Sequence, residues 1–366
     1  MIDFRYHLVS IVAVFLALTV GLVLGTTMLQ DPLLNTLKSE TADLRGQSEE
    51  LRAERDDSEL LNAGADQFTD AVAGSVLEGR LLDRRVVLVA APGADEEVVR
   101  ALGGRVEDAG AEVVGQLLFE EAFLDSGSAT FVDELAFQVS DDPGDLSGNP
   151  YDKAGTELGR ALAARGGADE DGEETKEKEE DPEEETDGET DGEEDRADGH
   201  DANAVLSAFA EGGLLTVEGS PARSADTVVV VAPAAGAPEE DEERANTALA
   251  GLTAALHRQV GPTVLAGGTD SGRQGGLVAH ARAQEPSYAT VDVVGRPTGD
   301  LVVVLALADS LDGSGSAYGI GEGVVAFLPD PLPRPLTEPV EEAAADAEAA
   351  PGNEDEARRA VSGDGE

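Results

Sequence analysis

Side chains that commonly carry chemistry are few and scattered in this chain of 366 residues. There is no cysteine, which excludes disulfides, thiolate metal ligands and cysteine nucleophiles. The sequence also lacks the GxxxxGKS/T, GxSxG and HExxH patterns of phosphate-binding loops, serine hydrolases and zinc proteases. We therefore expect a protein that is not an enzyme.

A soft transition metal would need imidazole or thioether ligands. The chain offers two methionines and four histidines, and none of them recurs at the spacing of metal ligands: Met1, Met28, His7, His200, His257 and His280. We expect His257 and His280 to be ordinary helix residues. The residues alone predict no cofactor and leave the ligands of any metal unknown.

One glycine-rich segment, residues 266–272, follows an apolar strand and precedes a predicted helix. An α/β fold can hold an anion at such a position. The chain contains 43 glycines, so an ordinary turn is the favoured interpretation. A small-ligand receptor or an enzyme that uses this turn would need a concave polar pocket beside Gly267 and Gly268.

The elements around this turn predict an α/β fold. A short apolar strand at 85–91, a helix at 94–108 and a strand at 111–119 form a βαβ unit. Further helices are expected at 131–139, 153–164, 204–210, 240–258, 275–283 and 298–312, and further strands at 227–233, 263–266 and 289–294. The segment 298–312 is ambiguous, and residues resembling caps at both ends favour helix. We expect two Rossmann-like halves, 80–165 and 204–330, in one layered region.

Two segments are too polar to fold. Residues 166–203 are rich in Glu, Asp and Gly and nearly free of apolar side chains, so we expect a disordered acidic insertion. Residues 331–366 are rich in Pro, Ala and Glu and should form a disordered tail. The net charge of −51 excludes nucleic acid as a partner, because the phosphates would be repelled.

The N-terminal segment predicts a membrane anchor within residues 1–30. Residues 8–29 carry no charge and, as a helix, would reach about 33 Å, which matches a hydrocarbon core of about 30 Å. A cleaved signal peptide is the main alternative, but its apolar part is shorter and ends in an A-x-A-like site. We expect an uncleaved single span, with the N-terminus cytoplasmic and the long C-terminal part extracytoplasmic.

Small residues recur every fourth position within this span and form a ridge on which two helices could pack in lipid: Ala13, Ala17, Gly21 and Gly25. Beyond the span, Asp31 and Pro32 predict the start of a new helix. Residues 31–62 then follow a heptad pattern whose apolar seam is Leu34, Leu37, Leu44 and Leu51. We expect a coiled-coil stalk and a parallel homodimer; the alternative is an amphipathic helix that packs on its own domain.

The opening residues MIDFRYHLVSIVAVFLAL and the segment VGLVLG at 20–25 closely resemble the actinobacterial family named for the copper transport protein MctB, some of whose corynebacterial members are called SteB. Thr290-Val-Asp292, the segment VLAL at 304–307 and Tyr318-Gly-Ile-Gly321 also resemble the C-terminal half of that family. The resemblance covers most of the chain outside the acidic insertion and the tail.

This resemblance implies two functional pictures. One is copper homeostasis or efflux, with copper as a cargo and an association with an outer membrane. The other is an envelope scaffold in cell separation, in which the coiled coil acts with a second membrane protein on peptidoglycan-hydrolase regulation. The resemblance supplies no catalytic or copper-ligand residues. We therefore expect a membrane-anchored envelope protein that acts through protein–protein assembly.

Overall fold

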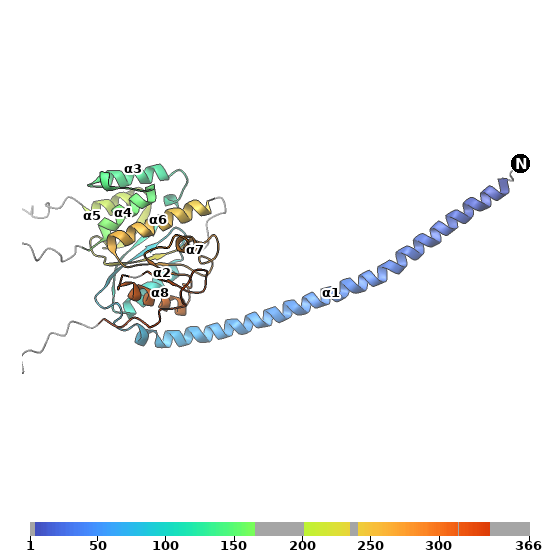
Figure 1. Cartoon of the computed structure of the whole chain (residues 1–366), viewed down its shortest axis with the longest axis horizontal. Coiled ribbons are helices and arrows are strands. Elements are labelled where there is room, and N and C mark those ends of the chain that lie inside the picture. Colours follow the sequence, from blue (N-terminus) through green and yellow to red (C-terminus); the bar gives the residue numbers. More distant parts are fainter. Residues whose placement is uncertain (1–3, 165–200, 235–240, 314, 337–366) are drawn as a thin grey trace, which may run out of the picture. The chain divides into compact units, whose positions relative to one another are not determined.

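The computed structural model describes residues 4–164, 201–234, 241–313 and 315–336, and the side chains of all of these except 26–36. Contacts divide the chain into two compact units, Met1–Gln67 and Phe68–Glu366. Figure 1 shows a long helix and a layered α/β head, which we describe in turn.

The first unit consists of most of helix α1 (Phe4–Leu77), which is 74 residues long. The prediction of a new helix at Asp31 is wrong, because α1 runs unbroken through Asp31 and Pro32 and well past residue 62. A proline within a helix removes one backbone hydrogen bond, and here the helix continues on both sides of it. The last turns of α1 belong to the second unit, where Leu77 is fully buried.

The second unit is built on one seven-stranded sheet in the order β3-β2-β1-β4-β5-β6-β7. All neighbouring strands are parallel except β2 and β3, which are antiparallel. The strands are β1 (Arg85–Ala90), β2 (Glu112–Phe119), β3 (Leu215–Gly219), β4 (Thr227–Val231), β5 (Thr263–Ala266), β6 (Ala289–Val291) and β7 (Ala317–Tyr318). The sheet continues from β1 to β4, so the two predicted halves form a single layer.

Helices cover both faces of this sheet (Figure 1). One face packs against α3 (Ala129–Val139), α4 (Pro150–Leu162), α5 (Ala202–Glu211), α6 (Glu242–Val260) and α7 (Leu277–Arg282). The other packs against α2 (Glu96–Asp108), α8 (Pro297–Ser310) and the end of α1. Alternate strand residues, such as Val87 and Leu88, enter opposite cores, which explains why the strands are apolar throughout. Two short 3-10 helices lie in the connections from β2 to α3 and from α3 to α4: Glu121–Phe123 and Pro143–Asp145.

The layered α/β fold is confirmed, and so is the choice of helix for the ambiguous segment that becomes α8. Strands β3 and β7 were not predicted, because each lies at an edge of the sheet and is only partly buried, so it lacks a continuous apolar run. Most of the predicted acidic insertion and tail lies outside the described residues. At the described end of the predicted insertion, α5 already begins at Ala202. At the described start of the predicted tail, Leu336 N donates a backbone hydrogen bond to Gly79 O at 2.8 Å.

Candidate functional site

Two of the C-terminal segments on which the family resemblance rests meet at the carboxyl ends of β6 and β7. Asp292 follows β6, and residues 318–321 form the end of β7 and the loop after it. The Asp292 carboxylate is fully buried and accepts hydrogen bonds from Ile320 N and Gly321 N, each at 2.8 Å. The segments are separated by more than 20 residues in sequence, and the parallel pairing of β6 with β7 brings them together.

Arg282, at the end of α7, supplies the positive charge for this buried carboxylate. Its Nη1 lies 2.5 Å from Asp292 Oδ2, and its side chain is only 6% exposed. The same guanidinium donates to Thr290 Oγ1 at 2.9 Å and to Tyr318 O at 2.8 Å. A desolvated charge pair of this kind is stable only when the remaining polar atoms are also hydrogen-bonded, as they are here. The network therefore fixes the loop after β7 to the sheet.

Glycines surround the carboxylate because there is no room for side chains. A Cβ atom on Gly319 would overlap Asp292 Oδ1, and its φ of +124° is a conformation that other residues rarely adopt. A Cβ on Gly272 would lie 2.6 Å from Asp292 Cβ. Gly272 belongs to the glycine-rich segment 266–272, so this segment packs against the buried ion pair.

The structure favours the turn interpretation of residues 266–272. Ser271 N donates to Gly268 O at 2.9 Å, which closes a tight turn, and Ser271 Oγ accepts from Val278 N at 3.2 Å. A Cβ on Gly267 would lie 2.7 Å from Ser271 Cβ. The hollows described next to this turn are lined by residues 270–272 and 274–276 and not by Gly267 or Gly268.

The parallel strands β1 and β4 are neighbours, and the helices that follow them, α2 and α6, cover opposite faces of the sheet. Ligands of α/β folds commonly bind at such a switch point. Here Ala234 N donates to Gly93 O at 2.9 Å across the crevice, and the hollow beside it measures about 110 Å³. The first turns of both helices carry two glutamates, which disfavour phosphate binding. This crevice does not suit a dinucleotide.

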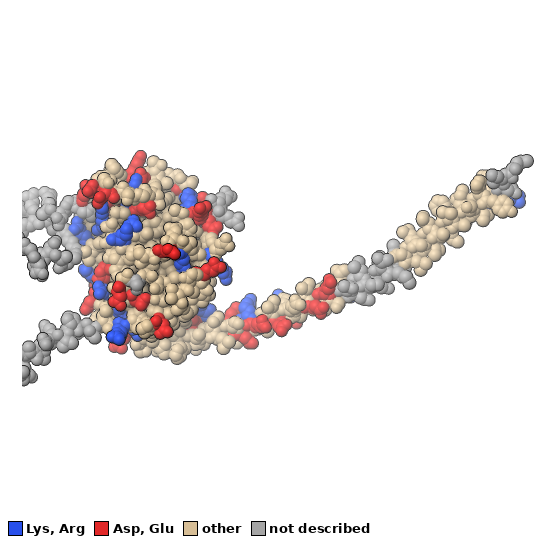
Figure 2. Space-filling view, in the orientation of Figure 1, with Lys and Arg blue, Asp and Glu red and all other residues tan. Residues whose placement is uncertain are grey.

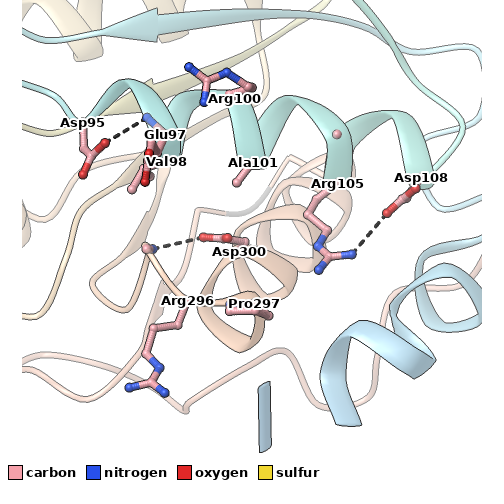
Figure 3. A pocket seen from close by; sticks show the side chains of 12 residues that line it. Asp95, Glu97, Val98, Arg100, Ala101, Arg105, Asp108, Arg296, Pro297 and Asp300 are labelled. Atoms are coloured by element: carbon pink, nitrogen blue, oxygen red, sulfur yellow. Dashed lines mark hydrogen bonds and ion pairs between the residues drawn. The ribbon is translucent and has the colours of Figure 1, made fainter. Parts of the chain in front are cut away.

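A hollow of about 660 Å³ lies between α2 and α8 (Figure 3). Two of its carboxylates have partners in the fold: Asp95 accepts from Glu97 N at 2.8 Å, and Asp300 accepts from Gly295 N at 3.0 Å. Arg105 Nη1 lies 3.3 Å from Asp108. Figure 3 shows Arg100 and Arg296 directed away from each other. The hollow is lined by both acidic and basic side chains, and these do not converge on one point where a charged ligand would bind.

Two of the four histidines, His257 and His280, are engaged in local contacts. His257 Nδ1 lies 2.8 Å from Gly261 O, and its ring lies 6.0 Å from that of Tyr288. His280 Nε2 lies 2.8 Å from Gln284. His7 is an exposed residue of α1, and His200 lies outside the described residues. Within the part of the chain that the structure describes, no group of three His, Cys, Asp or Glu side chains is arranged to hold a metal ion.

Two tyrosines near the C-terminal edge of the sheet have raised pKa values. Burial, together with the Asp309 carboxylate that accepts its hydroxyl at 2.6 Å, raises the pKa of Tyr318 to about 12. Burial also raises the pKa of Tyr288. Both phenols are therefore neutral structural groups at physiological pH.

The predicted membrane and stalk residues all lie on α1. Ala13, Ala17, Gly21 and Gly25 are exposed on the apolar part of the helix, and apart from the adjoining residues and backbone of the helix no atom lies within 4 Å of a Cβ built on Gly21 or Gly25. Leu37, Leu44 and Leu51 are 52%, 65% and 65% exposed, and the side chain of Leu34 is outside the described set. Figure 2 shows that the first part of α1 carries no charged side chain beyond the basic group at its tip, and that acidic and basic side chains appear farther along the helix. That these residues pack against the same residues of a second copy stays a prediction.

Sequence reasoning missed Arg282 and the role of Asp292. Asp292 and Ile320 stand in segments that carry the family resemblance, which was the available signal. Arg282 gave no signal, because one arginine at the end of a short helix is indistinguishable from a surface residue until the fold pairs it.

Comparisons with known proteins support the resemblance over most of the chain. Residues 1–329 match the family model described as "Copper transport outer membrane protein, MctB". The "Copper transporter MctB" of Mycobacterium tuberculosis is 29% identical over 331 residues, which cover 89% of this chain and 98% of the relative. The protein of the same name from Mycobacterium leprae is 28% identical over 334 residues, with the same coverage of both chains. The chain therefore belongs to the MctB family.

Proposed function

We propose that this protein is a single-pass, membrane-anchored envelope protein that serves copper homeostasis by assembling with other proteins through α1. The family description supports the link to copper and to the envelope. The observation that carries the assembly role is the series of exposed leucines along α1. In this proposal the head is a binding module with no catalytic step.

The apolar start of α1 supports the anchor. Phe4–Gly25 has a mean hydropathy of 2.7 over its 22 residues, and none of it is buried against the rest of the chain. An α-helix of this length reaches about 33 Å, enough to cross the hydrocarbon core. The positive-inside bias of the short leading segment is weak. We place the short N-terminal segment in the cytoplasm and the long acidic part on the extracytoplasmic side, which agrees with the envelope location in the family description.

The charges beside the exposed leucines favour a second copy as the partner of α1. Leu37, Leu44 and Leu51 are spaced by seven residues and would form one side of a helix–helix seam. One flank of the seam is basic, because a basic residue follows each leucine directly: Lys38, Arg45 and Arg52. The other flank carries the acidic residues Glu40 and Glu54.

The direction of pairing follows from these charges. In a parallel, in-register pair, Glu40 of one copy faces Arg45 of the other. In an antiparallel pair the basic flank would face a second basic flank, which is repulsive. The pattern therefore supports a parallel homodimer, and it gives the exposed leucines an apolar surface to bury.

Disulfide crosslinking tests this assembly directly, because the chain has no cysteine of its own. Leu44→Cys in native membranes should give a disulfide-linked dimer, since the two seam residues would face each other. Ala42→Cys, on the opposite side of α1, is the matched control and should stay monomeric. Equal crosslinking of both variants, or none of Leu44→Cys, would remove the support for a seam.

The link between assembly and copper needs a cellular measurement. A strain lacking the gene is complemented with wild type or with a variant carrying Leu37→Asp, Leu44→Asp and Leu51→Asp. We expect the triple variant to reach the membrane and yet fail to restore normal cell-associated copper. Full restoration of copper handling by a monomeric triple variant would refute the proposal.

The same strains distinguish the alternative role in cell separation, which the exposed stalk serves equally well. Under that alternative the triple variant leaves copper content normal and produces chains of unseparated cells. Microscopy and metal analysis of the same cultures therefore decide between the two functions.

A further inference from the structure

An exposed apolar surface lies on the loop that follows β7. The side chains of Ile320 and Val325 are 65% and 77% exposed, and Phe327 and Leu332 are exposed farther along the same segment. Single exposed aliphatic residues are common on proteins and need no explanation. Here two of them lie on one short loop, and we call the exposed side chains of Ile320 and Val325 the Ile320 surface.

The loop is held rigidly although its side chains face solvent. Ile320 N and Gly321 N are bound by the buried Asp292 carboxylate, and Arg282 contacts the backbone oxygens of Tyr318 and Glu322. Gly319 N and Val325 N also donate backbone hydrogen bonds, to Ala326 O and Ala317 O. A partner that binds a loop of this kind loses little free energy to ordering it, which is a property of preformed binding surfaces.

An acidic hollow is lined in part by Glu322, which lies two residues after Ile320. Its volume is about 960 Å³, and its described lining includes three glutamates and a histidine but no Lys or Arg: Glu242, Glu243, Glu322 and His280. Glu322 belongs to the same loop as Ile320. The surface therefore places an apolar contact beside a region that attracts positive charge.

We propose that the Ile320 surface docks a polypeptide segment that carries a Lys or Arg side chain next to a large apolar side chain. The apolar residue would contact Ile320 and Val325, and the basic group would enter the acidic hollow. The three glutamates of the hollow argue against an anionic membrane as the occupant, and against the same acidic surface of a second copy. This inference deepens the assembly role of the proposed function, but it depends on neither copper nor the pairing of α1.

Selection of peptides on the full chain tests the proposal. The protein is placed in nanodiscs of zwitterionic lipid and panned against a phage library of random twelve-residue peptides. Enriched peptides should combine basic and large apolar residues. One of them, made synthetically, should bind about tenfold more weakly to Ile320→Asp, as expected when a central apolar contact is lost. Glu322→Gln should weaken binding by about threefold, and added salt should weaken it further.

The control is Phe137→Asp on α3, an aromatic residue that is 59% exposed on another element. It should bind the peptide as wild type does, and circular dichroism should show that all three variants are folded. Failure to enrich basic–apolar peptides would overturn the proposal, and so would equal affinity for wild type and Ile320→Asp. The crosslinking and copper measurements on α1 are independent of this outcome, so failure of one proposal is distinguishable from failure of the other.

Discussion

The buried ion pair of Asp292 and Arg282 should be a main determinant of the stability of the head. Replacing Asp292 with Asn keeps the size of the side chain and removes the negative charge. Arg282 is then left buried, with its side chain 6% exposed, and the Asn amide can present a donor to the Ile320 and Gly321 donors. Breaking a buried pair by removing one partner costs about 3–5 kcal/mol of unfolding free energy.

The chain provides a closely matched control for this substitution. Asp270 and Arg273 form a pair at the same distance of 2.5 Å, but both side chains are 73% exposed. Asp270→Asn should therefore cost less than about 1 kcal/mol, because water screens an exposed pair. The two substitutions are chemically identical and differ mainly in burial.

Urea unfolding followed by tyrosine fluorescence separates the two outcomes. The protein contains four tyrosines and no tryptophan, and Tyr151, Tyr288 and Tyr318 are buried in the head, so their emission reports its unfolding. With a slope of roughly 3 kcal/mol per molar urea, Asp292→Asn should lower the midpoint by about 1–2 M. Equal midpoints for Asp292→Asn and Asp270→Asn would refute the reasoning that burial makes this pair important.

Three further predictions concern the same elements. The raised pKa of Tyr318, about 12, means that the folded head favours the neutral phenol; stability should be intact below pH 10 and fall as the pH rises toward 12, and Tyr318→Phe should reduce this fall in urea titrations at pH 8 and 11. Gly319→Ala should destabilise the head by about 3 kcal/mol, measured by the same titration, because its φ is +124° and its Cβ would overlap the buried carboxylate. Reversing Glu40 to Lys should reduce dimer crosslinking through Leu44→Cys, and adding Arg45→Glu should restore it; an additive loss in the double variant would count against parallel pairing.

Patterns that are local along the chain predicted their elements well. The apolar runs that became β1 and β4, and the helical periodicity of α2 and α6, are patterns of residues that lie close together in the sequence. Short edge strands are different: β7 has two residues, and it forms only because β6 offers a partner. The local rule that a proline marks the start of a new helix also failed at Pro32, because α1 continues through it.

By itself, the sequence determined the apolar segment, the spacing of the leucines on α1, the layered α/β class and the family resemblance, because each is encoded by residues close together or by a direct match of residues. Only the tertiary structure decided that Arg282, Asp292 and Ile320 act together. Their contacts join the end of a short helix, the end of one strand and the loop after another. No pattern of spacing reveals such a pairing, because its energy arises when the sheet removes both charges from water.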